Sequence, residues 1–226
     1  MPLTAESPHN FETKTICCFV LDISGSMSGE PIHELNQGLK EFHQEIHDDE
    51  TTSQRLEVAI VTFNDRINTV QEPALVDSFL PPQLIAGGYT KLVDGVREAI
   101  RLVDGHKQWY RQTGQQYLRP WIVLITDGAP DAGQDVDGLA REIKEGMDDK
   151  KFIFLAVGVQ QADMKVLKKI SGSLNGQPVD PLRLKGLKFS EFFQWMSASM
   201  SVISSSAEGD RLALPSPSSW MEGFEV

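Results

Sequence analysis

Short apolar runs that alternate with amphipathic segments constrain the fold of this 226-residue chain more than any other feature of its sequence. The clearest run, Thr15 to Leu21, leads directly into Asp22. Comparable runs span residues 56–63, 121–126 and 152–159. A strand that is apolar at successive positions is covered on both faces, as strands are in parallel sheets. The runs therefore predict buried, parallel strands.

Segments with apolar residues at helical spacing separate these strands. Pro31 opens the first of them, and Leu35, Leu39 and Phe42 share one of its faces. Further helices are expected over residues 92–103, 136–147, 164–170 and 189–203. Such alternation implies crossover connections that place helices on both faces of one sheet. The predicted fold is α/β: a doubly wound, mostly parallel central sheet of about six strands with helices on both faces.

Weaker signals complete the predicted organisation. Residues 67–70 suit a short strand, and residues 179–184 suit an edge strand because Pro178 and Pro181 lack the donor that an inner strand needs. We expect an N-terminal extension (1–13), one domain (14–204) and a Ser/Pro/acidic tail (205–226). The tail's apolar residues include Leu212, Leu214, Trp220, Met221 and Phe224. A loose terminus is the favoured interpretation, and the alternative is a segment that docks in a groove.

Composition excludes some partners and suggests a location. The net charge is −11 and the basic residues are scattered, so the field of the protein should repel nucleic acid. The N-terminal residues have no pattern for export, and no apolar run approaches the roughly 20 residues that span a bilayer. Cys17 and Cys18 are neighbours in a strand, where side chains alternate between faces, so they should not bond to each other. We expect a cytoplasmic protein without membrane insertion.

Oxygen-bearing side chains gather where three segments end. Asp22, Ser24 and Ser26 alternate after the first strand, with Gly25 relaxing the backbone between them. Asp127 follows the strand at 121–126, and Thr90 follows Gly87 and Gly88 ahead of a helix. Ligands of parallel sheets bind beyond the carboxyl ends of strands. Hydroxyl and carboxylate oxygens without imidazole or thiolate favour Mg²⁺, with Mn²⁺ or Ca²⁺ as alternatives.

These residues resemble a known family. Asp22-Ile-Ser-Gly-Ser26, Thr90 and Thr126-Asp127-Gly128 are similar, in order and placement, to the metal-ion-dependent adhesion site of von Willebrand factor type A domains. The resemblance covers roughly Ile16 to Ile203. It implies that Ser24, Ser26 and Thr90 bind the ion directly, whereas Asp22 and Asp127 act through water or hydrogen bonds. It further implies that a partner's carboxylate completes the site, and that a shift of the last helix tunes binding. The candidate partner contacts are Gly25, Met27, Lys91 and Gly128.

A narrower resemblance suggests a cellular role. Leu21 to Ile32 and Phe79-Leu-Pro-Pro82 look like the bacterial TerY-like branch, which is associated with tellurite resistance. That branch implies an adaptor that works beside a protein kinase and a phosphatase in stress signalling. The chain departs from the family's usual Thr-Asn-Leu-Gly at Thr90-Lys-Leu-Val93, which leaves partner preference open. It also has no cysteine beyond Cys18, so the zinc ribbon of some relatives is not expected.

Enzymatic alternatives match the sequence poorly. A phosphatase with Asp22 as nucleophile would need an acid where Ser24 stands. A serine hydrolase would need a late histidine, and the last one is His106. His43, Glu45 and His47 do not have the order of a zinc protease. We therefore expect a binding protein rather than an enzyme, with an adhesive ligand-binding domain or an accessory subunit of an ATP-driven chelatase-like complex as alternatives.

Overall fold

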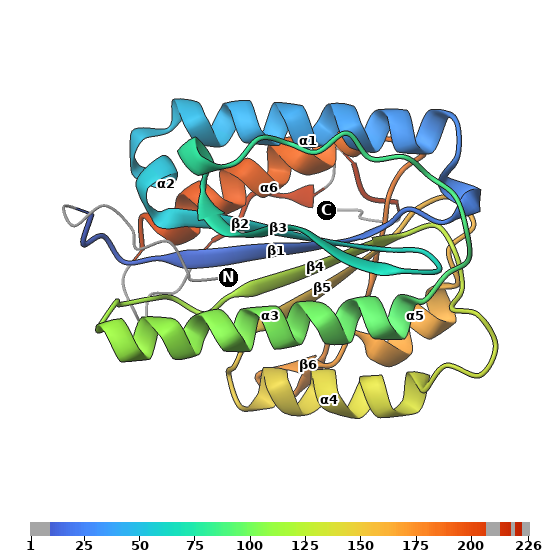
Figure 1. The fold of residues 1–226 in the computed structure, drawn as a ribbon. Coiled ribbons are helices and arrows are strands. Elements are labelled where there is room, and N and C mark those ends of the chain that lie inside the picture. The colour runs from blue at the N-terminus through green and yellow to red at the C-terminus, as the bar shows by residue number, and fades with distance from the viewer. Residues whose placement is uncertain (1–9, 207–212, 218–219, 223–226) are drawn as a thin grey trace.

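A six-stranded sheet runs through the middle of the molecule, with helices packed on both of its faces (Figure 1). The computed structural model describes residues 10–206, 213–217 and 220–222. The strand order is β3-β2-β1-β4-β5-β8. The strands are β1 (Thr15–Asp22), β2 (Leu56–Phe63), β3 (Ile67–Leu75), β4 (Trp121–Thr126), β5 (Ile153–Gly158) and β8 (Leu182–Arg183). All neighbours pair in parallel except β2 and β3. The predicted fold class is confirmed.

Helices cover the two faces of the sheet unequally. α1 and α6 lie on one face, and α3, α4 and α5 lie on the other (Figure 1). The helices are α1 (Glu30–Asp48), α2 (Glu50–Arg55), α3 (Leu92–Thr113), α4 (Val136–Asp148), α5 (Met164–Ile170) and α6 (Phe189–Ser204). Shorter elements are the 3₁₀ turns η1 (Gly25–Met27) and η2 (Val76–Ser78) and the hairpin strands β6 (Ser173–Leu174) and β7 (Gln177–Pro178).

The inner strand β1 divides its side chains between two cores. Cys17, Phe19 and Leu21 face the helix pair α1 and α6, whereas Cys18 and Val20 face α3 and α4. Strand geometry requires this alternation. Both cysteines are buried and free, as expected. The strand is therefore buried on both sides, and its last residue, Asp22, emerges at the carboxyl edge of the sheet.

Some elements differ from the prediction. β3 continues to Leu75, runs antiparallel to β2 and forms one edge of the sheet. α3 continues to Thr113, where Gly114 takes the left-handed conformation that commonly ends helices. α2 was not predicted, and Asp49 caps it by accepting hydrogen bonds from the amides of Thr51 and Thr52. The expected edge strand at 179–184 is reduced to Leu182–Arg183.

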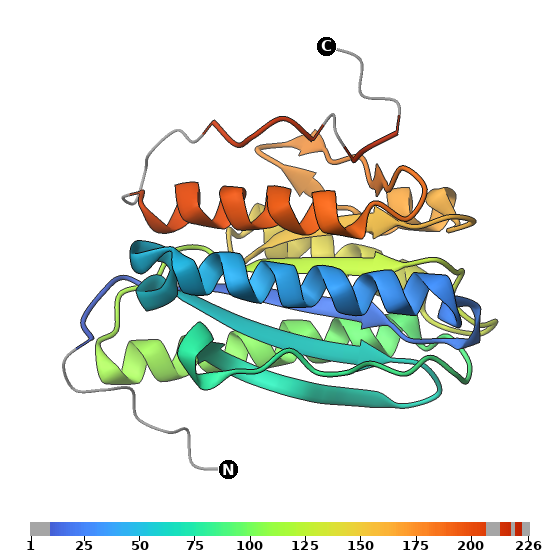
Figure 2. The same cartoon turned by 90° about the horizontal axis from the view of Figure 1, so that it is seen from above.

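The described part of the tail packs against the domain. We call residues 213–217 and 220–222 the C-terminal strap. Trp220 is fully buried, and its ring lies 5.0 Å from that of Phe192 and 5.2 Å from that of Trp195. Trp195 Nε1 donates to the carbonyl of Pro215 (2.7 Å), so the strap runs alongside α6 (Figure 2).

Main-chain contacts fix the strap to the sheet as well. The amide of Lys185 donates to the carbonyl of Trp220 (2.7 Å), and the amide of Glu222 donates to that of Arg183 (2.9 Å). Met221 forms an antiparallel bridge with Leu184. These contacts favour the docking alternative over a loose terminus for the described residues. Leu212, Phe224 and residues 1–9 of the N-terminal extension lie outside the described residues.

No helix in the described part of the chain is long and apolar enough to cross a membrane.

Candidate functional site

Three loops meet at the carboxyl edge of the sheet. The first loop (23–29) follows β1, the second (86–91) precedes α3, and the third (127–131) follows β4. β1 and β4 are parallel neighbours, with Leu21 paired to Ile125, so their loops begin side by side. The amide of Gly87 donates to the carbonyl of Ile23 (2.8 Å), and the amide of Gly25 donates to that of Gly88 (3.0 Å). The first two loops are therefore joined along their backbones.

Asp22 is fixed at the bottom of this cluster. Its carboxylate is fully buried: Oδ1 accepts from the amide of Ser24 (2.8 Å), and Oδ2 accepts from Oγ1 of Thr126 (2.5 Å). The Thr126 hydroxyl in turn accepts from the amide of Gly128 (3.2 Å). Asp22 therefore ties the first loop to the start of the third. Thr126 belongs to the recognised motif, but no role had been predicted for it.

The serine hydroxyls connect the first loop to Asp127. The hydroxyl oxygens of Ser24 and Ser26 lie 3.1 Å apart. Oγ of Ser26 donates to Oδ1 of Asp127 (2.7 Å), across 101 residues of sequence. Ser24 is almost fully buried, whereas Ser26 is exposed. Three side chains predicted from their spacing thus form one connected chain of oxygens.

Thr90 faces the same place from the second loop. A Cβ on Gly128 would lie 3.9 Å from both Oγ1 of Thr90 and Oδ2 of Asp22. The absence of a side chain at Gly128 leaves the space between these oxygens open. Asp131 and Gln134 hold the backbone of Thr90: its amide donates to Oδ2 of Asp131 (2.9 Å), and its carbonyl accepts from Nε2 of Gln134 (2.6 Å). Sequence reasoning missed both of these supporting residues.

The two carboxylates carry negative charge into a buried environment. Burial raises the pKa of Asp22 to about 6, although hydrogen bonds from Ser24 and Thr126 act in the opposite direction. Burial likewise raises the pKa of Asp127. Within the described residues, neither carboxylate forms an ion pair with a lysine, arginine or histidine. Buried carboxylates without a positive partner are unfavourable, so a cation would stabilise them.

The donor chemistry fits a hard cation. The described residues contain no group of three or more His, Cys, Asp or Glu side chains that could hold a metal. The candidate set is instead two carboxylates, of Asp22 and Asp127, and three hydroxyls, of Ser24, Ser26 and Thr90. Oxygen donors of this kind suit Mg²⁺ or Mn²⁺ better than zinc or copper. The residues present are therefore compatible with the ion that the sequence predicts.

The candidate partner contacts differ in accessibility. Gly25 and Lys91 are exposed and Gly128 is half-buried, so all three can be reached from solvent. Met27 is fully buried in the core beneath the first loop. The turn η1 directs its side chain inward, away from solvent. This corrects the expectation that Met27 contacts a partner.

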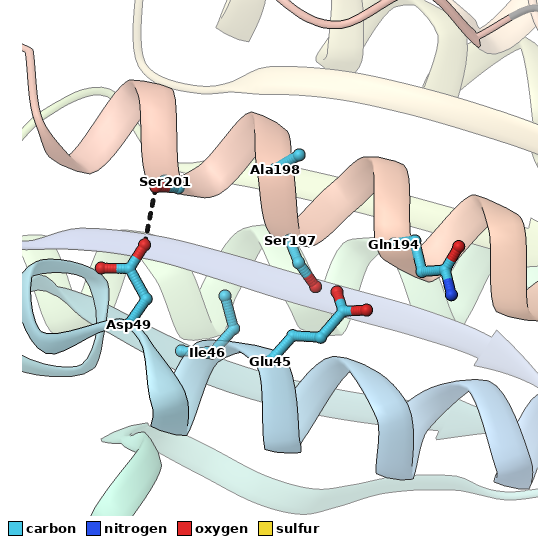
Figure 3. A pocket seen from close by; sticks show the side chains of 7 residues that line it. All are labelled: Glu45, Ile46, Asp49, Gln194, Ser197, Ala198 and Ser201. Carbon is cyan, nitrogen blue, oxygen red and sulfur yellow. Dashed lines mark hydrogen bonds between the residues drawn. The ribbon is translucent and has the colours of Figure 1, made fainter.

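A separate groove lies between α1 and α6 (Figure 3). Its volume is about 390 Å³, and it is lined by Glu45, Ile46, Asp49, Gln194, Ser197, Ala198 and Ser201. Oγ of Ser201 donates to Oδ2 of Asp49 (2.7 Å) and closes one end of it (Figure 3). Glu45 lies about 20 Å along α1 from Glu30, which follows the first loop. The groove is therefore not part of the oxygen cluster.

An open, mostly parallel sheet with polar loops at its carboxyl edge defines the doubly wound class of α/β ligand-binding domain. Within that class, the profile of the von Willebrand factor type A domain matches residues 17–179, and the chain belongs to this family. The search of curated proteins gives no match to the sequence.

Solved structures share the fold at low sequence identity. Proximal thread matrix protein 1 from the mussel byssus is 17% identical with a TM-score of 0.57, and the match covers 83% of this chain and 46% of that one. The pilus adhesin SpaC from Lactobacillus rhamnosus GG is 14% identical with a TM-score of 0.63, covering 84% and 30%. The ArnB paralog VWA2 from Sulfolobus acidocaldarius is 15% identical with a TM-score of 0.53, covering 83% and 45%. This chain thus spans less than half the length of each.

Proposed function

We propose that this von Willebrand A domain holds one Mg²⁺ ion among the three loops and uses it to bind a carboxylate of a partner protein. One observation carries the proposal. Asp22 and Asp127 are 0% and 7% exposed, accept hydrogen bonds from the hydroxyls of Thr126 and Ser26, and have no cationic side chain paired with them among the described residues. A divalent cation would balance both charges.

The five oxygen-bearing residues would divide the work. Ser24, Ser26 and Thr90 offer neutral hydroxyls as direct ligands. Asp22 orients the first loop through the Ser24 amide, and Asp127 orients the hydroxyl of Ser26. Because the hydroxyl ligands are neutral, they would leave most of the positive charge of a bound ion uncompensated. The ion would therefore attract an acidic group of a partner. Mn²⁺ or Ca²⁺ could occupy the same oxygens.

The cellular part of the proposal rests on sequence resemblance. The motif that resembles the TerY-like branch includes the first loop and begins α1, and Phe79-Leu-Pro-Pro82 lies on the segment that leads to the second loop. We infer an adaptor of that kind, in the cytoplasm, with a protein kinase and a phosphatase as candidate partners. The solved structures named above include an adhesin and a matrix protein, and at their identities they support a shared fold and no particular partner.

Substitutions at the oxygen cluster test the metal role. We expect Asp22→Ala and Thr90→Ala to weaken Mn²⁺ binding at least about tenfold, measured by electron paramagnetic resonance with Mg²⁺ as competitor, because each removes an oxygen or its anchor. Ser28→Ala is the matched control, since Ser28 is an exposed serine of the first loop outside the cluster. Circular dichroism should show that all three variants are folded. Unchanged Mn²⁺ affinity in both site variants would disprove the metal role.

Capture of partners tests the adaptor role separately. Immobilised protein is incubated with lysate in Mg²⁺ or in chelator, and retained proteins are identified by mass spectrometry. A kinase or phosphatase that is retained by the parent only in Mg²⁺, and lost with Asp22→Ala, is the expected result. An ATPase would instead favour the chelatase-like alternative, and partners retained in chelator would move recognition away from the metal.

A further inference from the structure

Two large apolar side chains are exposed near the oxygen cluster, one directly before the second loop and one within it. Ile85 is 80% exposed and Tyr89 is 73% exposed, whereas Leu84, the residue directly before Ile85, is buried. Tyr89 directly precedes Thr90, so its Cα lies about 3.8 Å from that of a candidate metal ligand. Isolated apolar residues on a surface are ordinary, but here one precedes a candidate ligand and the other lies two residues before Gly87, whose amide binds the first loop.

The backbone beneath these side chains is held firmly. Asn36, a buried residue of α1, binds Leu84 in both directions: its Nδ2 donates to the carbonyl of Leu84 (2.9 Å), and its Oδ1 accepts from the amide (2.8 Å). The anchored backbone carries the Leu84 side chain buried in the core, whereas the next side chain, that of Ile85, is exposed. A polar anchor in the core thus holds the backbone directly before Ile85.

Tyr89 is positioned by a second set of contacts. Nδ2 of Asn64 donates to the carbonyl of Gly87 (2.7 Å), and the amide of Lys91 donates to the carbonyl of Asn64 (2.9 Å). Gly88, between them, has φ +85°, and a Cβ there would lie 2.1 Å from Oδ1 of Asp65. Only glycine fits this backbone comfortably. The loop that carries Tyr89 is thus set before any partner arrives, which lowers the entropic penalty of binding.

Lys91 adds a positive charge to the same loop. It is exposed, and its ammonium group forms no ion pair with any carboxylate in the described residues. The net charge of the chain is −11, and Lys91 is the residue next to the candidate ligand Thr90. A cation next to exposed apolar groups complements a surface that combines negative charge with apolar area.

We propose that Ile85, Tyr89 and Lys91 form a recognition rim that selects a protein segment presenting an Asp or Glu within a few residues of an apolar or aromatic side chain. The inference rests on the proposed function, because the carboxylate of that segment is the group that the metal site would bind. The rim supplies what a metal alone lacks, which is discrimination between acidic partners. Burial of Ile85 and Tyr89 provides affinity, and Lys91 accelerates the approach of the acidic group.

A displayed library of random 12-residue peptides tests the rim. The full chain in Mg²⁺ should enrich peptides with an acidic residue near an apolar or aromatic one. A selected peptide should bind Ile85→Ser and Tyr89→Ser about tenfold or more weakly than the parent. Lys91→Ala should reduce the association rate and its dependence on salt. Leu80→Ser is the matched control, since Leu80 is 83% exposed and follows Phe79, whose carbonyl contacts His43 far along α1 from the site.

Measurement of Mn²⁺ affinity separates the two proposals. Ile85→Ser, Tyr89→Ser and Leu80→Ser should bind Mn²⁺ within about twofold of the parent, because none removes an oxygen of the cluster. Lys91→Ala should bind Mn²⁺ no more weakly than the parent, because it removes a positive charge near the cation. A parent without measurable Mn²⁺ affinity would sink the metal-dependent function itself. If the parent binds Mn²⁺, three results would overturn the rim alone. The parent enriches no acidic peptide, it enriches acidic peptides without apolar neighbours, or the selected peptide binds Ile85→Ser and Tyr89→Ser as tightly as the parent.

Discussion

Asp22 is suited to the candidate metal site but destabilises the fold when no metal is bound. Burial raises its pKa to about 6, whereas an unfolded aspartate titrates near 3.9. Between these values the folded chain binds more protons than the unfolded chain, so the stability contributed by this group falls as pH rises from about 4 to 6. The loss is complete about one pH unit above the folded pKa. A bound divalent ion would reverse it by stabilising the ionised carboxylate.

Asp22→Asn should separate these two effects. Asparagine keeps an oxygen for the Ser24 amide and removes the charge. In chelator at pH 7.5 we expect the variant to be more stable than the parent by on the order of 1–3 kcal/mol in urea unfolding, with the difference disappearing near pH 4. Added Mg²⁺ should raise the midpoint of the parent only. A variant less stable than the parent at pH 7.5 would contradict this account.

The residues of the oxygen cluster were predictable, but their supports were not. Asp22, Ser24 and Ser26 can be recognised in the sequence because they alternate directly after a buried strand. The structure places them close to Thr90 and Asp127. Asn64, Asp131 and Gln134 act by binding backbone groups of a loop that is distant in sequence. Such contacts depend on how loops pack in three dimensions, and no local spacing encodes them.

At the level of elements, the close approach of α1 and α6 depends on one glycine. A Cβ on Gly38 would lie 2.4 Å from Cδ2 of Phe193, so no side chain fits there without movement. Gly105, within α3, has no atom within 4 Å of the same position. Gly38→Ala should therefore lower the free energy of unfolding by about 1–2 kcal/mol, because overpacking outweighs the gain in helix propensity.

Gly105→Ala is the matched control and should raise the free energy of unfolding by about 0.5–1 kcal/mol, through helix propensity alone. Urea unfolding of both variants, compared with the parent, measures the two effects. Stabilisation by both substitutions would show that α1 and α6 are not in close contact at Gly38.

Elements with regular apolar patterns were predicted well. Elements whose extent depends on polar partners elsewhere in the chain were not. β4 and α5 have the expected bounds. The end of α3 was missed because His106 and Lys107 look like surface residues, yet both are buried. His106 pairs with Glu57 of β2 (2.6 Å), and Lys107 binds Asp104 and the carbonyl of Lys151. The partners that make such burial possible lie elsewhere in the fold, so the local pattern does not reveal them.

For the whole molecule, the C-terminal strap extends the core beyond the last helix. Trp220 is the largest fully buried side chain and packs on Phe192 and Trp195. Trp220→Ala should lower the free energy of unfolding by about 3–5 kcal/mol, because it leaves a large cavity. Leu80→Ala, at an exposed apolar position, should change it by no more than about 0.5 kcal/mol. A loss below about 1 kcal/mol for Trp220→Ala would show that the strap is not part of the folded core.

Both edges of the sheet are protected against pairing with a strand of another molecule, and the strap protects one of them. On one side β3 carries Pro73, which has no amide hydrogen to offer a foreign strand. On the other side the strap occupies the carbonyl of Arg183 and the amide of Lys185. A chain ending at Ser206 would expose these groups together with the aromatic face of α6. We expect this truncated chain to self-associate, with a larger molar mass by light scattering than the full chain at the same concentration. The strap would then prevent neighbouring molecules from adding strands to each other's sheets.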